Sequence, residues 1–421
     1  MKLITLLCLS FTSFAQKGTR TLLKADRVFD GEEMHVGWSV LVNGNKIEAI
    51  GILANIPANT NIILLPGTTL LPGLIEGHSH LFLHPYNESG WDEQVLNESR
   101  TERTARAVNH AKATLMAGFT TVRDLGTEGA MYDDVALKKT IEKGIVVGPR
   151  MIVATRAIVG RGAYGPKSDN PDLNYPQGAA EVGNIPELLN EVRIQIGKGA
   201  DLIKIYADYG WGKNKEVAPA FTIEEIASAV AIVKSSGRQV VAHATSAEGM
   251  RRAIMAGVNT IEHGDNGTTE IFALMKEKNI AFCPTISAGL AYSAYKALEK
   301  GAEPDSTDIY QKKKSFAIAL KTGVTICMGG DVGVFTHGDN AREMEWMVNY
   351  GMLPQAVLQA ATSVNADAFG YGHQVGRLKK GLLADIIAIK GDPYKAISSV
   401  RQVIMVMKDG ILYKIPPATG K

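Results

Sequence analysis

The chain has 421 residues, of which 45% are hydrophobic and 21% are charged, a composition typical of globular proteins. Lys and Arg number 45 against 43 Asp and Glu, which gives a formal net charge of +2, and the basic residues form no stripe. This balance argues against nucleic acid as a partner. The length is enough for one large domain together with a smaller one.

The first residues are typical of a secretory signal peptide. Lys2 precedes the apolar run 3–14, and the small residues Ser13 and Ala15 fit an A-x-A-like cleavage site. We therefore predict a signal peptide over residues 1–15 and expect an exported protein, periplasmic or secreted; a buried first helix is the alternative. No other apolar run reaches the ~18 residues that a membrane span requires, so we expect no membrane insertion after the signal is removed.

Short strand-like runs occupy both ends of the remaining chain. Residues 19–71 contain an Asn43-Gly44 turn between two apolar runs, a strong hairpin signal. Residues 371–415 repeat the pattern with a turn at Asp409-Gly410. Because neither end has enough strands to bury a core of its own, we predict that the two ends pair into one small β-sandwich domain.

Between these ends, over residues 72–370, strand-like runs alternate with longer helical segments. The runs cover 74–80, 120–125, 150–155, 202–207, 239–244, 260–264, 281–286 and 324–330. Eight such repeats over about 300 residues predict an α/β fold, a (β/α)8 TIM barrel. The polar segment 161–184, rich in Gly, Pro, Asp and Asn, is expected to form an extended loop over the mouth of this barrel.

Residues able to bind metal stand at the ends of the predicted barrel strands, where the active site of such a barrel is built. His78 and His80 end the first run, and alternate side chains of a strand share a face, so both can bind one metal ion. Scanning the other strand ends adds Lys204, His243, His263 and Asp331. Each alone is more often a structural residue, but together on one face they indicate a metal site.

The segments that carry these residues resemble the amidohydrolase superfamily of binuclear metal hydrolases, in its carboxylated-lysine branch. They are His78-Ser79-His80, Ile203-Lys204-Ile205, Ala242-His243-Ala244, Glu262-His263-Gly264 and Gly329-Gly330-Asp331. The flanking β-sandwich matches this superfamily as well, and the resemblance covers nearly all of the chain after the signal peptide.

The resemblance implies two divalent metal ions, with Zn²⁺ expected and manganese, cobalt or iron left open. His78, His80 and Asp331 would hold one ion, His243 and His263 the other, and Lys204, carboxylated by CO2, would bridge them. An unmodified lysine is cationic at neutral pH and would repel both ions. The resemblance further implies that a metal-bridging hydroxide attacks a carbonyl, while Asp331 passes a proton to the leaving nitrogen.

Further residues near the strand ends are candidates for binding substrate: Tyr206, Tyr209, Arg156, Arg161 and His337. Tyr and Arg at a barrel mouth suit a substrate with a carbonyl and a carboxylate, because a guanidinium binds a carboxylate through two hydrogen bonds.

The resemblance is closest to imidazolonepropionase-like and Xaa-Pro dipeptidase-like members. Those often have His-Ala-His on the fifth strand and Gly-His-Gly after the third, where this chain has Thr245 and Arg161. We therefore expect hydrolysis of an amide C–N bond in a small peptide-like substrate with a free carboxylate, such as an Xaa-Pro or other dipeptide, or an N-acyl amino acid. Opening of a cyclic amide or lactone is the enzymatic alternative, and a binding protein that keeps only the barrel is the non-enzymatic one. A homo-oligomer is common among such barrels, and assembly stays open.

Overall fold

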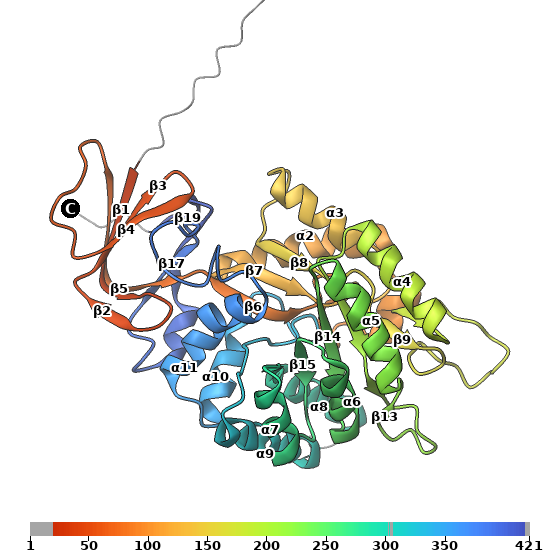
Figure 1. The fold of residues 1–421 in the computed structure, drawn as a ribbon. Helices are drawn as coiled ribbons and strands as arrows, with labels where there is room; N and C mark the ends of the chain where they lie inside the picture. The colour runs from red at the N-terminus through yellow and green to blue at the C-terminus, as the bar shows by residue number, and fades with distance from the viewer. Residues whose placement is uncertain (1–19, 302, 304–305, 417–421) are drawn as a thin grey trace, which may run out of the picture.

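Both ends of the chain join in one mixed sheet. The computed structural model describes residues 20–301, 303 and 306–416, so the predicted signal peptide lies outside the described residues. The sheet has eight strands in the order β19-β18-β17-β5-β1-β3-β4, with β2 beside β1 (Figure 1). Its strands are β1 (Arg20–Phe29), β2 (Met34–Val36), β3 (Ser39–Asn43), β4 (Lys46–Gly51), β5 (Asn61–Pro72), β17 (Ile386–Lys390), β18 (Val403–Lys408) and β19 (Ile411–Lys414).

Strand β5 links the two chain ends, because it pairs parallel to β1 and antiparallel to β17. Side chains of β17 alternate between two hydrophobic cores. Ile386 and Ala388 pack among strands of the sheet itself, whereas Ile387 and Ile389 belong to the larger core that the helices and the other strands share. This period of two is the ordinary strand pattern. The predicted union of the ends is therefore present, while its layering as a sandwich stays a prediction.

Parallel strands make up the central part of the molecule. They are β6 (Leu74–Ser79), β7 (Phe119–Asp124), β8 (Arg150–Val153), β9 (Ile158–Gly160), β10 (Ala180–Val182), β11 (Leu202–Tyr206), β14 (Gln239–Ala244), β15 (Thr260–His263) and β16 (Ala281–Cys283), with a short antiparallel pair, β12 (Asp208–Tyr209) and β13 (Ala218–Pro219). One sheet runs β6-β7-β8 and another β10-β9-β11-β14-β15-β16. Seven of the eight predicted barrel strands are thus present, in the predicted order.

The eighth predicted strand, 324–330, is not a regular strand. It makes an isolated parallel bridge to β16 at Ile326, and the Gly77 N–H of β6 donates to Met328 O at 3.1 Å, so the segment still lies between β16 and β6. Thr325 O and Cys327 N–H also bond the backbone of Phe282 in β16. Beyond this point side chains accept from the segment: Met328 N–H donates to the Asn365 amide oxygen and Gly330 N–H to Glu76 Oε1. The ladder of a regular strand is therefore present only in part.

Helices surround the parallel strands in Figure 1. They are α1 (Trp91–Leu96), α2 (Arg100–Met116), α3 (Asp133–Glu142), α4 (Ile185–Lys198), α5 (Ile223–Ser235), α6 (Ala247–Ala256), α7 (Thr269–Glu277), α8 (Ile286–Lys300), α9 (Ser306–Thr322), α10 (Ala341–Asn349), α11 (Pro354–Gln359) and α12 (Asn365–Ala368), with a π-helix η1 (Ala360–Val364) and a 3-10 helix η2 (Ile397–Arg401). Thr222 and Glu225 form a capping box that begins α5. Over the described part of the chain, no helix is at once long and apolar enough to cross a bilayer.

A buried ion-pair cluster fixes the mixed sheet to the parallel strands. Arg150 of β8 donates to Asp385 at 2.6 Å and to Asp409 at 2.5 Å, and Asp385 is nearly fully buried.

Replacing Asp385 by Ala leaves the guanidinium without one partner, so we expect a loss of about 3 kcal/mol of folding free energy and a lower melting temperature by calorimetry. Glu248→Ala removes a comparable pair on the exposed face of α6 and should change the melting temperature little. Equal effects of the two substitutions would contradict this role of Asp385.

Candidate active site

Four histidines and one aspartate meet at the carboxyl ends of the parallel strands. The centroid of the His78 ring lies 5.3 Å from that of His80 and 5.1 Å from that of His263. The centroids of the His243 and His263 rings are 4.4 Å apart. Asp331 Oδ1 is 3.3 Å from His80 Nε2 and 3.6 Å from His78 Nε2. Ligand atoms of His78, His263 and Asp331 lie within 4.8 Å of one another, a group that could hold a metal ion. The structure thus brings these five predicted ligands together.

Lys204, the sixth predicted ligand, lies in β11 with no solvent exposure. Its Nζ has no hydrogen-bond partner, and neither has His243 Nδ1. Burial lowers the pKa of Lys204 to about 8. An isolated buried ammonium is unfavourable. The unpartnered nitrogens of Lys204 and His243 therefore indicate that a further group binds between these side chains. The residues present therefore fit a metal centre.

Hydrogen bonds on the outer side of the rings fix their orientation. Nδ1 of His78 contacts Glu262 Oε2 at 2.9 Å, and Nδ1 of His80 contacts the Gly126 carbonyl at 2.8 Å. Nδ1 of His263 contacts Thr285 Oγ1 at 2.8 Å. Because Nδ1 of His78 and of His80 is already hydrogen-bonded, both rings direct Nε2 toward Asp331. Metal-ligating histidines are held in the same way, with one ring nitrogen bonded to a supporting group and the other free for the metal.

Arg123 and Glu262 form a buried pair behind His78. Arg123 Nη2 donates to Glu262 Oε1 at 2.8 Å, and both side chains are fully buried. Arg123 also donates to Gly77 O at 2.6 Å, which ties β7 to the strand that carries His78. Burial by itself would raise the pKa of Glu262, but the charge of Arg123 and the bond from His78 hold it below its ordinary value. Glu262 is therefore an ionised acceptor at neutral pH.

The ionisation states of the inner residues suit metal binding. Burial lowers the pKa of His78 to about 4 and those of His243 and His263 well below the usual value, so these rings are neutral at pH 7. Burial also acts on His80, but Asp331 outweighs it and raises the pKa of His80 to about 9. Metal binding at His80 therefore displaces a proton.

Two of the inner residues have left-handed backbone conformations. His263 has φ = 73° and Asp331 has φ = 60°, and Thr285, which bonds the His263 ring, has φ = 48°. Non-glycine residues in this region are strained, and such strain gathers at functional sites. The sharp turns direct these side chains inward at the point where each strand or bridge segment ends.

A cavity of about 750 Å³ opens over these residues. His80, His243, His263 and Asp331 form part of its lining. Its walls are rich in aromatic side chains, namely Tyr86, Trp91, Tyr164, Tyr206, Tyr209, Tyr292 and Tyr295. Tyr206 stacks on the ring of His243 at 4.4 Å with an interplanar angle of 15°. Tyr206 and Tyr209, both predicted to bind substrate, are therefore placed to do so. From the predicted loop 161–184, residues 164–167 also line the cavity.

The other three predicted substrate-binding residues point elsewhere. Arg156 donates to Ala179 O at 2.9 Å, and Arg161, which is exposed, pairs with Glu187 at 2.6 Å. His337 is buried against Leu83 O and stacks on His110. None of the three belongs to the described lining of the cavity, so the structure does not bring them together with Tyr206 and Tyr209. Their side chains bind protein groups instead: the Ala179 and Leu83 carbonyls and the Glu187 carboxylate.

Sequence reasoning missed Glu128 and three lysines that line the same cavity, Lys167, Lys296 and Lys312. Glu128 follows the last residue of β7 by four positions, so it lies beyond the end of the predicted strand 120–125. Its signal in the sequence is the preceding Gly126, which permits the chain to turn after the strand.

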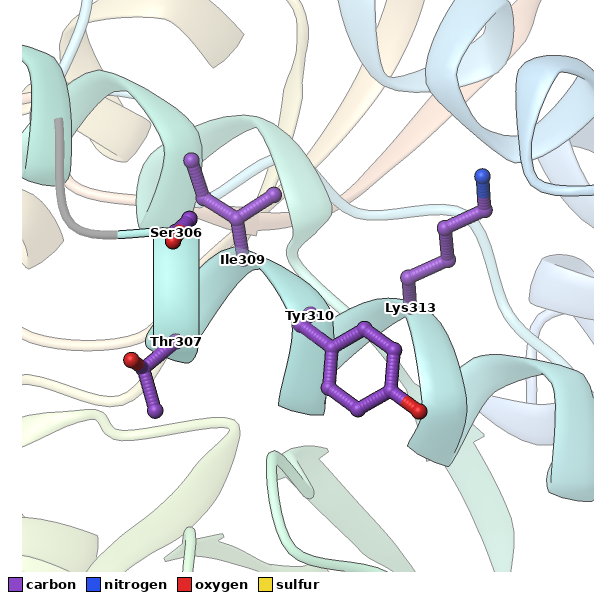
Figure 2. Close-up of a pocket in the computed structure, with 5 residues that line it drawn as sticks. All are labelled: Ser306, Thr307, Ile309, Tyr310 and Lys313. Carbon is purple, nitrogen blue, oxygen red and sulfur yellow. The ribbon is translucent and has the colours of Figure 1, made fainter.

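A second hollow, of about 480 Å³, lies at the start of α9 (Figure 2). Figure 2 shows five side chains from one stretch of this helix: Ser306, Thr307, Ile309, Tyr310 and Lys313. Among these described lining residues none is a histidine, cysteine or carboxylate, so they offer no metal-binding cluster comparable with that of the central cavity.

Comparison with known proteins agrees with this geometry. The model of the amidohydrolase family matches residues 69–412. The chain belongs to the amidohydrolase family. It is therefore an enzyme that hydrolyses carbon–nitrogen bonds, and the non-enzymatic alternative falls away. Members of this family generally bind a divalent metal, and the structure of this amidohydrolase provides groups that could hold one.

Several relatives span almost the whole amidohydrolase chain. Ochratoxinase of Aspergillus niger is 28% identical over 444 residues, covering 94% of this chain and 87% of the relative. A crystal structure of an Xaa-Pro dipeptidase with bound methionine in its active site is 33% identical, with a TM-score of 0.84 over 94% of this chain and all of the other. Imidazolonepropionase of Deinococcus radiodurans is 23% identical over 390 residues, covering 86% of this chain and 87% of the relative. The structural likeness implies a TIM-barrel α/β fold.

The supporting pair behind His78 yields a testable prediction. Glu262→Gln keeps the shape of the side chain but removes the charge that orients the His78 ring, so we expect Zn²⁺ affinity to fall about 10- to 100-fold. Competition with a chromogenic chelator measures this affinity. Glu270→Gln, which changes an exposed residue of helix α7, is the control and should leave the affinity unchanged. Wild-type affinity in Glu262→Gln would show that Glu262 does not support the ligand.

Proposed function

We propose that this amidohydrolase cleaves the amide C–N bond of a small peptide-like substrate with a free carboxylate, such as an Xaa-Pro or other dipeptide, or an N-acyl amino acid. The observation that carries the proposal is that His80, His243, His263 and Asp331 line an aromatic cavity of about 750 Å³, with His78 beside them. That volume suits a ligand of dipeptide size. The likeness to an Xaa-Pro dipeptidase and to ochratoxinase supports it.

We propose further that His78, His80 and Asp331 hold one divalent ion, His243 and His263 a second, with Zn²⁺ the expected metal and a carboxylated Lys204 bridging the two. The unpartnered, buried Nζ of Lys204 supports this assignment. Because its pKa is lowered to about 8, a fraction of this amine is uncharged at neutral pH and can add to CO2. The carbamate replaces a cation by an anion, which suits a site of neutral imidazoles. When bound, the ions supply an acidified water and polarise the scissile carbonyl.

Asp331 is the proton carrier in this proposal. Burial would raise its pKa, but His78 and His80 hold the pKa below the ordinary value, so the carboxylate is ionised at neutral pH. It faces the cavity within 3.3 Å of His80. From this position Asp331 can accept a proton from the attacking water and deliver it to the leaving nitrogen, which must be protonated as the C–N bond breaks.

The cavity offers different groups to the two ends of a substrate. Aromatic walls suit an apolar side chain or a proline ring. Lys167, from the loop over the cavity, and Lys296 of α8 are exposed cations at its rim, and we propose that they attract the substrate carboxylate in place of Arg156 and Arg161. The predicted signal peptide would place this enzyme outside the cytoplasm, where peptides are available.

Opening of a cyclic amide or lactone remains the second candidate. The observation that favours it is the similarity to imidazolonepropionase over 86% of the chain. The same groups would act on a ring carbonyl, and the lysines at the rim would then lack a carboxylate to bind.

A substrate panel tests the proposal. Zinc-loaded enzyme is incubated with Xaa-Pro and other dipeptides, N-acyl amino acids, their C-terminal amides, and cyclic amides and lactones. We expect release of amino acid from free acids, lower kcat/KM for the C-terminal amides, and a loss of at least about 10³-fold in kcat for Asp331→Asn. Turnover confined to ring substrates would favour the second candidate. Full activity of Asp331→Asn would contradict its role as proton carrier.

A further inference from the structure

Glu128 is a buried carboxylate that the proposed reaction does not use. Only 2% of the residue is exposed, and it lines the central cavity. Its backbone lies in the left-handed region, with φ = 47°, where a non-glycine residue is strained. The Arg103 guanidinium holds this turn, since Nη1 donates to Glu128 O at 2.7 Å and Nη2 to Thr127 O at 2.9 Å. The conformation that directs Glu128 into the cavity is therefore fixed by a buried clamp.

The two oxygens of the Glu128 carboxylate differ in their partners. Oε2 accepts hydrogen bonds from Tyr164 at 2.7 Å and from Trp91 Nε1 at 3.0 Å. Oε1 accepts only a long bond of 3.5 Å from Tyr206. It also lies 3.9 Å from His80 Nδ1, which is already bonded to the Gly126 carbonyl at 2.8 Å. Oε1 therefore retains capacity for a strong donor from the cavity side.

No permanently charged side chain of the described residues makes an ion pair with Glu128. Among the described residues, the one basic side chain within 4.0 Å of its carboxylate is His80, which is neutral when it serves as a metal ligand. Arg103 is nearby, but three of its nitrogens donate to backbone carbonyls, including Phe82 O at 3.1 Å. Buried carboxylates are normally paired with a cation. In the metal-loaded enzyme Glu128 thus lacks a direct cationic partner.

Aromatic rings surround this carboxylate. The Tyr164 ring lies 5.1 Å from Trp91, 5.0 Å from Tyr206 and 4.9 Å from Tyr209, all at steep interplanar angles. Trp91, Tyr164, Tyr206 and Tyr209 all line the central cavity, and the π faces of aromatic rings attract cations. A carboxylate with a free oxygen among such rings has the chemistry that binds an ammonium group.

From these contacts we propose that Glu128, together with Trp91, Tyr164, Tyr206 and Tyr209, forms an ammonium subsite that binds the free α-amino group of a dipeptide substrate. The inference rests on the proposed function, because the subsite opens into the same cavity. Glu128 Oε1 is 3.9 Å from the ring of His80, so the bound ammonium lies beside the reacting centre. In a dipeptide a single carbon separates the α-amino nitrogen from the scissile carbonyl, whereas a lysine side-chain amine lies much farther away. The preferred substrate class is therefore the dipeptide rather than the N-acyl amino acid.

Two substrates that differ only in the amino group test the subsite: phenylalanyl-proline and 3-phenylpropanoyl-proline. With zinc-loaded wild-type enzyme we expect kcat/KM to be about 10- to 100-fold higher for the amine, the range of one charge-assisted hydrogen bond. Glu128→Gln should reduce this ratio at least about tenfold. Glu299→Gln, which changes an exposed carboxylate at the rim of the cavity, should retain the wild-type ratio. A wild-type ratio near one would overturn the subsite without any variant, as would an unchanged ratio in Glu128→Gln.

A binding measurement separates this inference from the reaction itself. Phenylalaninol and 3-phenylpropanol cannot be hydrolysed and differ only in the amino group. By calorimetry we expect the amine to bind the wild-type holoenzyme at least about tenfold more tightly, and Glu128→Gln to lose that difference. If neither proline derivative is cleaved but the amine binds in this way, the proposed reaction fails while the subsite stands. Equal binding of the two alcohols by the wild-type holoenzyme overturns the subsite.

Discussion

The structure depends on the convergence of six polar side chains, buried or nearly so, in one small space at the ends of the parallel strands. Four imidazole rings follow one another at centroid distances of 4.4 to 5.3 Å, with Asp331 between them and Lys204 buried nearby. Such a group is costly to bury unless each member has a partner. Within the described protein, Lys204 Nζ and His243 Nδ1 have none. Metal ligation is the interaction that would satisfy them together.

Hydrogen bonds from the surrounding protein fix the positions of several of these side chains. A buried chain of contacts runs from Arg123 through Glu262 to His78, and Arg123 also bonds the backbone of the strand that carries this histidine. Glu76 accepts a hydrogen bond from the N–H of Gly330, the residue before Asp331, and another from the Asn340 side chain. Burial raises the pKa of Glu76 to about 8, so this support involves a carboxyl group that is largely protonated at neutral pH. Strain in the left-handed turns at His263 and Asp331 is offset by these contacts.

Local patterns in the sequence predict the strands and most of the inner residues. Alternation of apolar residues marks seven of the eight expected strands, and histidines at their ends meet because parallel strands end on one side. The irregular form of the eighth strand was beyond such reasoning, since Asn365 and Glu76, distant in the sequence, accept the hydrogen bonds of its Met328 and Gly330 N–H groups. Loop directions are equally non-local: Arg161 turns outward because Glu187 is there to pair with it. Glu128 was missed because its direction depends on a left-handed turn held by Arg103.

The most direct test is the metal content of the purified wild-type enzyme, dialysed after incubation with Zn²⁺ and bicarbonate and measured by elemental analysis. Six converging ligands, with Lys204 carboxylated, predict two zinc ions per chain. A content of one ion or none would contradict the binuclear centre on which the proposed reaction is built.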